Sequence, residues 1–369
     1  MSAHEIILAV LAFFAVLGGL DRIFGNRFGL GREFERGLLA LGELALSMVG
    51  VICLAPVLAR LLRPVVVPVY RFLGADPAMF AGTILACDMG GAALAQAMAG
   101  SPEAGLLGGL IAGSMLGATV VFTIPVALGI LSPEDRPALA KGVLCGIVTI
   151  PLGVLAGGLA AGFSLLMVLR NLVPIVLIAL LIALGLWKWE TAMVRGFALF
   201  GKVVVALATL GLIAGITESL TGFSPIPGIT PISEGLAVAG EIALILAGAF
   251  PLVWVVTKLF RKPLLALGRK LRVNDQAAGG LIASLANSIA MFGMVQDMDP
   301  RGKVLNIAFA VSAAFVFGDH LGFTAGFAPE MIGPVILGKL VGGISALAVA
   351  MVLTRREPYE PTNACGPGP

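Results

Sequence analysis

Charged residues are scarce in this chain: Asp, Glu, Lys and Arg make up 12% of its 369 residues, against roughly 25% in soluble globular proteins. The chain has only 2 His, and its 4 Cys form no CxxC pair, so neither a metal site nor a disulfide framework is indicated. A formal net charge of +3 gives little support for nucleic-acid binding. One water-soluble core could not bury a chain with so few charged and so many apolar residues, because such cores stop growing near about 250–300 residues.

Apolar sequence, by contrast, is abundant: 59% of the residues are hydrophobic and the mean hydropathy is +1.03. A helix that spans a bilayer needs about 20 apolar residues, and stretches of that kind follow one another along the chain. We therefore predict an all-α polytopic membrane protein with about 11 transmembrane helices, followed by a disordered, Pro-rich tail over 355–369. The predicted spans are 4–24, 37–62, 76–99, 104–130, 139–163, 171–188, 196–217, 234–257, 276–297, 303–325 and 331–354.

The two halves of the chain resemble each other at a shift of about 199 residues, at which Asp88 meets Asn287. Similarity at a fixed offset indicates a duplicated architecture, which is common in transporters. We predict one transport domain over 1–354, in which two homologous five-helix repeats are joined by a connecting helix. Repeat one covers about 4–163, the connector 171–188 and repeat two about 196–354. Six crossings separate corresponding spans, which predicts parallel halves; the repeat becomes inverted if 171–188 does not cross.

The distribution of Lys and Arg predicts an orientation, because cytoplasmic loops are the more basic ones. The stretches 60–71 and 258–272 are both rich in Lys and Arg. Placing both in the cytoplasm puts the N-terminus inside and the C-terminus outside. Lys339, near the end of a span, is expected to extend its ammonium group to the membrane interface.

Several ionisable residues fall inside the predicted spans, where each costs about 2.5–3.5 kcal/mol and therefore suggests a function. Most of this charge is acidic, which favours a small cation as the transported solute, because a primary ammonium needs carboxylate or carbonyl acceptors. An aromatic face such as that of Phe292 could assist by cation–π attraction. The candidate binding residues are Asp88, Asn287, Asp319, His320, Phe292, Glu43 and Glu241.

Each candidate also has a purely structural interpretation. Asp88 could accept a hydrogen bond from a neighbouring helix, and Asp319 with His320 could form an ion pair that locks two helices together. Glu43 and Glu241, a symmetric pair, could line a wet vestibule. Phe292 could simply pack in the core.

Four segments of the chain stand out: TILACDMGG (83–91), SLANSIAMFGM (284–294), DPRGKVLN (299–306) and AFAVSAAFVFGDHLGF (308–323). They resemble the EutH family of bacterial inner-membrane ethanolamine permeases. The resemblance implies uptake of ethanolamine for a cytoplasmic ammonia-lyase that is housed in a microcompartment. Asp88, Asn287, Asp319 and His320 match the family pattern, whereas Glu43 and Glu241 do not belong to it.

We therefore predict a multi-pass protein of the bacterial inner membrane that moves ethanolamine by facilitated diffusion, without a cofactor and without enzymatic activity. Asp88 and the Asp319–His320 pair would receive the ammonium group near the midplane, and Asn287 would bond the hydroxyl group. One alternative is a proton- or sodium-coupled carrier of another small amine, such as choline or a polyamine, with His320 relaying protons. Others are a membrane-embedded enzyme that uses Asp319 and His320, and a receptor or scaffold. The oligomeric state is open, with a homodimer as one option.

Overall fold

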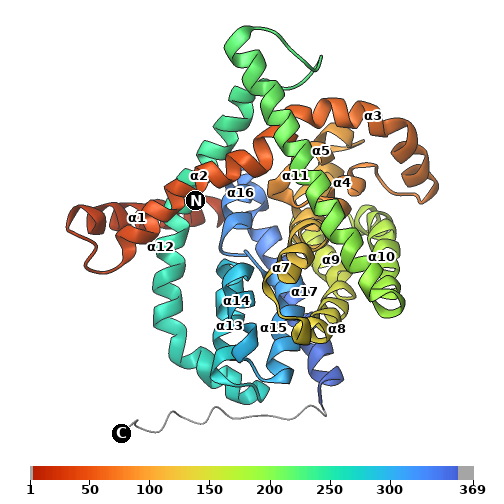
Figure 1. The fold of residues 1–369 in the computed structure, drawn as a ribbon. Coiled ribbons are helices and arrows are strands. Elements are labelled where there is room, and N and C mark those ends of the chain that lie inside the picture. Colours follow the sequence, from red (N-terminus) through yellow and green to blue (C-terminus); the bar gives the residue numbers. More distant parts are fainter. Residues whose placement is uncertain (1–2, 356–369) are drawn as a thin grey trace, which may run out of the picture.

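The computed structural model describes residues 3–355, and every regular element among them is helical (Figure 1). Eight of the described helices are long and apolar enough to cross a membrane, which agrees with the prediction of an all-α membrane protein. The predicted disordered tail lies, apart from Arg355, outside the described residues. The eight helices are 5–23, 30–72, 102–130, 133–160, 165–188, 191–221, 232–256 and 329–353.

The number of long helices differs from the predicted eleven, because the expected spans 76–99, 276–297 and 303–325 are each interrupted. All three are apolar enough to be taken for spans. Their α-helices end near the middle, where the backbone leaves the α-helical conformation for one to six residues. These interruptions position the candidate site.

The first interrupted segment is a helical hairpin, here called hairpin 1 (residues 76–100). Its two arms are α4 (Ala78–Ile84) and α5 (Gly91–Met98), separated by a 3-10 turn, η2 (Cys87–Met89). At its base, both carboxylate oxygens of Asp76 accept from the Gly100 N–H, the shorter bond being 3.0 Å. Hairpin 1 therefore returns to the end of the molecule from which it started.

The second interrupted segment, hairpin 2 (residues 274–299), is built in the same way from α13 (Asp275–Ala286) and α14 (Ser288–Met294). Asn287, in extended conformation, separates its arms. At its base, Asn274 N–H donates to Asp299 Oδ1 over 2.9 Å, and Asn274 Nδ2 donates to the carbonyl of Asp297 over 2.9 Å. This hairpin, too, begins and ends at one level.

The third interrupted segment consists of α15 (Pro300–Ala313) and α16 (Asp319–Phe327). The residues between them run alongside the end of α13, where Phe315 N–H donates to the Ser284 carbonyl and Phe317 N–H to the Leu285 carbonyl. Backbone groups that a continuous helix would have satisfied internally are therefore paired between two broken helices, as the membrane interior requires. The break before α16 lies against the tip of hairpin 2.

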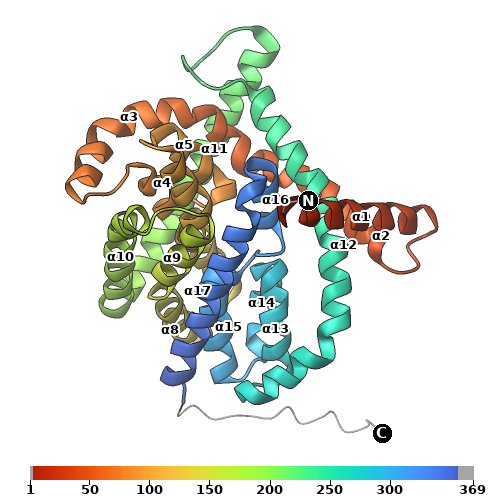
Figure 2. The same cartoon turned by 180° about the vertical axis from the view of Figure 1, so that it is seen from behind.

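The continuous helices surround these interrupted ones (Figures 1 and 2). The long unit α2–η1–α3 crosses α12, α1 packs on α12, and α11 packs on α3. On the other side of the molecule, α17 packs between α9 and α15. The bounds are α1 (Ala3–Ile23), α2 (Leu30–Leu44), η1 (Ala45–Val49), α3 (Gly50–Phe72), α6 (Pro102–Leu106), η3 (Leu107–Gly117), η4 (Thr119–Thr123), α7 (Ile124–Ile130), α8 (Arg136–Ile147), α9 (Ile150–Ala160), α10 (Leu165–Lys188), α11 (Glu190–Thr221), α12 (Ile232–Leu271) and α17 (Ile332–Leu353).

In Figures 1 and 2, α4 and α5 of hairpin 1 lie in the upper part of the molecule, whereas α13 and α14 of hairpin 2 lie in the lower part. At the hairpin 1 end, Asp76 N–H donates to Asn171 Oδ1 at the start of α10 over 2.7 Å. At the hairpin 2 end, Lys303 bonds Asp135 in the connection between α7 and α8 over 2.5 Å. Arg301 also bonds the carbonyl of Thr354 after α17 there. These contacts fix which connections share an end.

Candidate functional site

The tips of both hairpins and the break before α16 converge on one cavity of about 200 Å³, here called the central cavity. Since a water molecule occupies about 30 Å³ in the liquid, this space suits a small solute that keeps part of its hydration. Five of the seven predicted binding residues line it. The lining residues are Ala40, Glu43, Leu44, Ser47, Ala86, Asp88, Met89, Ala118, Phe122, Asn287, Ile289, Phe315, Asp319 and His320.

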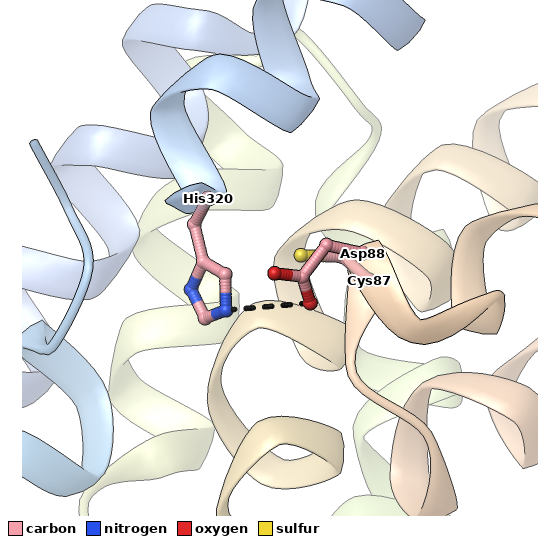
Figure 3. Close-up of side chains that lie close together, drawn as sticks. All are labelled: Cys87, Asp88 and His320. Atoms are coloured by element: carbon pink, nitrogen blue, oxygen red, sulfur yellow. Dashed lines mark ion pairs between the residues drawn. The ribbon is translucent and has the colours of Figure 1, made fainter. Parts of the chain in front are cut away.

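Asp88 lies on η2 at the tip of hairpin 1, where its side chain is 16% exposed. One of its carboxylate oxygens, Oδ1, is 3.7 Å from His320 Nε2 (Figure 3). His320 comes from the first turn of α16, so this pair joins two interrupted segments that are more than two hundred residues apart in the sequence. The expected Asp319–His320 ion pair is not the one that forms, because the ring faces Asp88 instead.

The other ring nitrogen of His320 is bonded to Lys339 of α17, with 3.0 Å between Nδ1 and Nζ. Lys339 Nζ also donates to the carbonyl of Ser114 over 2.6 Å, and the residue is 1% exposed. This placement corrects the expectation that Lys339 extends to the membrane interface. The three side chains of Asp88, His320 and Lys339 form a chain, here called the Asp–His–Lys chain, that leads from the cavity into the core.

The bonding of Lys339 determines which nitrogen of His320 carries the proton. An ammonium group has three donors and no acceptor, so Nδ1 must accept and the neutral ring carries its hydrogen on Nε2. The ligand atoms of Cys87, Asp88 and His320 lie within 4.8 Å of one another, as in a metal site. A protonated Nε2 has no lone pair for a metal, however, so the cluster is better suited to exchange of a proton or an ammonium group.

Asn287 divides its two polar atoms between the fold and the cavity. Its Oδ1 accepts from the Ile289 N–H over 2.7 Å and so caps α14. Its Nδ2 keeps two hydrogens with which it can donate to a ligand. A hydroxyl oxygen in the central cavity is a suitable acceptor.

Asp319 adds a second carboxyl group to the cavity from the first turn of α16, where the helix dipole favours negative charge. The charged groups that act on it are Asp88, Arg36 and Glu43. Glu43 lines the cavity from α2 but is itself exposed. The central cavity therefore carries three acidic side chains, with Arg36 nearby.

Two predicted residues lie away from the cavity. Glu241 is exposed on α12, so the symmetric pair that it forms with Glu43 in the sequence is not symmetric in its surroundings. Phe292 is 1% exposed and packs in the core. The aromatic rings that do line the cavity are Phe122 and Phe315, with 5.5 Å between their centroids. No sequence signal distinguished these two from other Phe residues in apolar stretches.

A second cavity of about 390 Å³ shares Asn287 with the first and is here called the vestibule. It lies between α2, α12 and the two arms of hairpin 2, and it extends from Asn287 toward Lys258 of α12. The guanidinium of Arg36 lies 5.0 Å from the centre of the Phe250 ring within it. The vestibule therefore continues the central cavity toward the hairpin 2 end.

Comparison with known proteins gives consistent results. The family model described as "Ethanolamine utilisation protein, EutH" matches residues 3–353. The chain is 60% identical to the probable ethanolamine permease EutH of Listeria monocytogenes over 356 residues, which cover 96% of this chain and 95% of that protein. It is 48% identical to the probable ethanolamine permease EutH of Escherichia coli, with 97% of each chain covered. It is 50% identical to the uncharacterized protein YxeR of Bacillus subtilis, with 96% of each covered. No solved structure matches the chain.

Proposed function

Because this chain belongs to the EutH family, we propose that it carries ethanolamine across the inner membrane of a bacterium by facilitated diffusion. The chain is a multi-pass membrane protein, and the names of its family and relatives indicate a permease rather than an enzyme. The single observation that carries the proposal is the central cavity, where Asp88 and Asp319 are placed with Asn287 among interrupted helices.

In the proposed pose, the substrate's ammonium group donates to Asp88 and Asp319 and replaces part of its hydration with carboxylate oxygens. The rings of Phe122 and Phe315 offer aromatic faces for cation–π attraction, the role that the sequence suggested for Phe292. The hydroxyl oxygen accepts from Asn287 Nδ2. One charged and one neutral polar end of the substrate thus meet acidic and amide groups respectively.

We further propose that the two halves form an inverted repeat. Both hairpins close at their base, and Gly100 and Asp299, which take part in these closures, are 199 positions apart. The long helices also meet reciprocally: Gly37 lies against Ala247, and Gly235 lies against Val49. Gly235 and Ala247 are the counterparts of Gly37 and Val49 at a shift of 198 residues. This pairing runs antiparallel.

Counting crossings supports the inversion. Hairpins that return to their starting end do not cross, so five crossings rather than six separate α1 from α11. An odd number places corresponding helices in opposite directions. The parallel arrangement expected from the sequence assumed that both hairpins cross the membrane. The inverted arrangement follows even though α10, the expected connector, still counts as a crossing helix.

The same count reverses the orientation expected from the sequence. The stretches 60–71 and 258–272 now lie at different ends, and most basic residues gather at the hairpin 2 end. By the positive-inside rule that end faces the cytoplasm, which places the N-terminus outside and the C-terminus inside. Basic residues toward the hairpin 2 end include Arg22, Arg27, Arg32, Arg136, Lys188, Lys258, Arg272, Arg301 and Lys303; those toward the hairpin 1 end are Arg60, Arg63, Arg71 and Arg170.

In this orientation the vestibule leads from the central cavity to the cytoplasm, so the conformation is open inward. Duplicated transporters bind their substrate near the midplane between repeats and expose it to the two sides in turn. A passive carrier of this design moves ethanolamine down its gradient. Consumption of ethanolamine in the cytoplasm would maintain that gradient.

The decisive experiment is counterflow of labelled ethanolamine into proteoliposomes at pH 6, where the neutral amine that crosses lipid unaided is scarce. We expect exchange by the unchanged protein and at least tenfold less by Asp88→Asn. The matched control is Glu103→Gln on α6, an exposed acid outside the cavity, which should exchange normally. Full exchange by Asp88→Asn would remove Asp88 from the site. Competition by choline, polyamines and alkylamines would identify the substrate if another amine competes better.

A further inference from the structure

We propose that Lys339 and the substrate's ammonium group are alternative cations of Asp88, so that the carrier exchanges one ethanolammonium for one proton given up by Lys339. This inference rests on the proposed transport function and specifies which residue carries the proton. It starts from the Asp–His–Lys chain, of which Lys339 is the member farthest from the cavity.

The ammonium group of Lys339 lies in the protein core. Lys339 is 1% exposed, and its hydrogen-bond partners among the described residues are the Ser114 carbonyl and the His320 ring rather than a carboxylate. A buried ammonium group is costly unless an opposite charge compensates it. Asp88, reached through His320, is the carboxylate that acts on it. Lys339 is thus the cation whose charge Asp88 compensates.

The substrate's ammonium group and Lys339 compete for the charge of Asp88. Arg36 is the cation that acts on Asp319, whereas Asp88 faces the His320–Lys339 pair. An ammonium group that binds Asp88 from the cavity would place two cations against this single carboxylate. Repulsion between them in a medium of low dielectric constant favours loss of one positive charge. Ethanolammonium retains its proton on Asp88, so the proton that leaves is that of Lys339.

The Asp–His–Lys chain provides a route for that proton. An Nζ–H bond of Lys339 breaks as Nδ1 of His320 gains a hydrogen, and the Nε2–H bond breaks as its proton passes by way of Asp88 to water in the cavity. Lys339 becomes a neutral amine, His320 stays neutral with its hydrogen on Nδ1, and Asp88 stays a carboxylate that pairs with the substrate. When the substrate leaves, a proton from water returns by the same atoms and restores the starting state.

Among the described residues, the titratable groups near Lys339 are the other members of the Asp–His–Lys chain and the adjacent Cys87. Cys87 and Asp88 on η2 and His320 on α16 are the titratable groups that act on it. The packed helix α9 contains no ionisable residue, and Arg301 and Lys303 on α15 bind Thr354 and Asp135 at the hairpin 2 end. Arg136 and Lys141 lie on α8, which begins at that same end.

The local helix geometry also suits the role. Ser114 lies in η3, a π-helix of 11 residues, and its carbonyl accepts from Lys339 Nζ. A π-helical stretch alters the regular hydrogen-bond ladder and is frequent at functional sites. A neutral carbonyl can hold the lysine in either protonation state. The side chain therefore need not move when its proton leaves.

Exchange of an ammonium for a proton moves no net charge, and at equilibrium it is equivalent to passage of the neutral amine. A carrier that moved ethanolammonium alone would respond to the membrane potential: its inside-to-outside concentration ratio would change about 50-fold for each 100 mV. The distinguishing measurement is uptake at pH 6 into proteoliposomes that contain the unchanged full chain, with the potential set by valinomycin and potassium. We expect accumulation that is the same at zero and at 100 mV, negative inside.

Two substitutions test the residue itself. Lys339→Met removes the buried ammonium group, so uptake should become electrogenic and accumulation should rise toward about 50-fold at 100 mV. Lys339→Arg keeps a charge that cannot be lost, and both net uptake and counterflow should fall at least tenfold. The control is Lys202→Met on α11, an exposed lysine, which should remain electroneutral. Melting temperatures of the purified variants identify any that fail to fold.

Accumulation by the unchanged protein that follows the potential overturns the proposal, and this measurement needs no variant. A folded Lys339→Met that stays electroneutral, or a fully active Lys339→Arg, also overturns it. In each of these cases normal counterflow leaves the proposed transport function intact. Absence of ethanolamine counterflow in the unchanged protein instead refutes the transport function itself.

Discussion

At the scale of single residues, the central cavity depends on side chains that serve two neighbours at once. Asn287 caps α14 with its oxygen and turns its NH₂ group to the cavity. His320 accepts from Lys339 on one side and faces Asp88 on the other. Substituting such a residue therefore affects both the local fold and the ligand, and tests must separate the two effects.

Asn287→Asp separates them, because aspartate caps a helix as well as asparagine does but cannot donate a hydrogen bond when ionised. We expect a melting temperature close to that of the unchanged protein. The preference for ethanolamine over ethylamine, which lacks the hydroxyl group, should fall about tenfold or more, since a good hydrogen bond to an uncharged group contributes about 0.5–1.5 kcal/mol and an unpaired one costs more. Competition of both amines against labelled ethanolamine measures this preference.

Asn287→Ala serves as the comparison, since it removes the cap and the donor together. It should lower the free energy of unfolding by about 1 kcal/mol and also reduce the preference. An unchanged preference in Asn287→Ala, which offers the hydroxyl group neither a donor nor an acceptor, would show that the amide does not bind the hydroxyl group.

At the scale of elements, the hairpins are decided by a few backbone positions. Gly90 follows the tip of hairpin 1 with φ of 83°, in the left-handed region where side chains are strained. A Cβ atom there would also overlap Val51 of α3. The tip thus requires glycine both for its conformation and for its contact.

Gly90→Ala should therefore destabilise the protein by about 1–3 kcal/mol and lower ethanolamine uptake by displacing Asp88. Thermal unfolding of the purified protein and counterflow measure the two effects. Gly42→Ala in α2 is the control, because that glycine is helical with open space around it and alanine favours helix. A Gly90→Ala variant as stable and active as the control would show that the tip tolerates a different geometry.

At the scale of the whole molecule, the proposed orientation predicts the location of both termini. An epitope tag after Pro369 should be reached by antibody only after the inner membrane is permeabilised. A tag before Met1 should be reached in intact spheroplasts. The opposite result would place the hairpin 2 end outside and refute both the orientation and the inward-open assignment.

A second prediction at this scale concerns pH. The ammonium of an alkylamine has a pKa near that of lysine, about 10, so each unit of lower pH reduces the neutral, lipid-permeant form about tenfold. Growth on limiting ethanolamine should therefore depend little on the protein at pH 8 and strongly at pH 6. The comparison is between cells with the unchanged protein and cells with Asp88→Asn. Equal growth of both at pH 6 would contradict the proposed role.

The sequence alone determined the class of the protein. The low charge and high hydropathy predicted an all-α membrane protein, and the segments around Asp88, Asn287 and Asp319 predicted the EutH family; both are confirmed. These conclusions follow from local composition and from motifs, which need no knowledge of contacts. The paired positions of Asp88 and Asn287 were likewise visible as a fixed offset in the sequence.

Only the tertiary structure decided how the chain passes through the molecule and what the buried charges touch. Hydropathy measures apolar length, and a hairpin that returns has the same apolar length as a helix that crosses, so 76–99 and 276–297 were predicted as spans. The Lys339–His320 hydrogen bond joins residues on separate helices, and nothing in the sequence around either residue indicates that they are in contact. Packing, not residue type, therefore brings Lys339 to the candidate site and leaves Phe292 and Glu241 outside the central cavity.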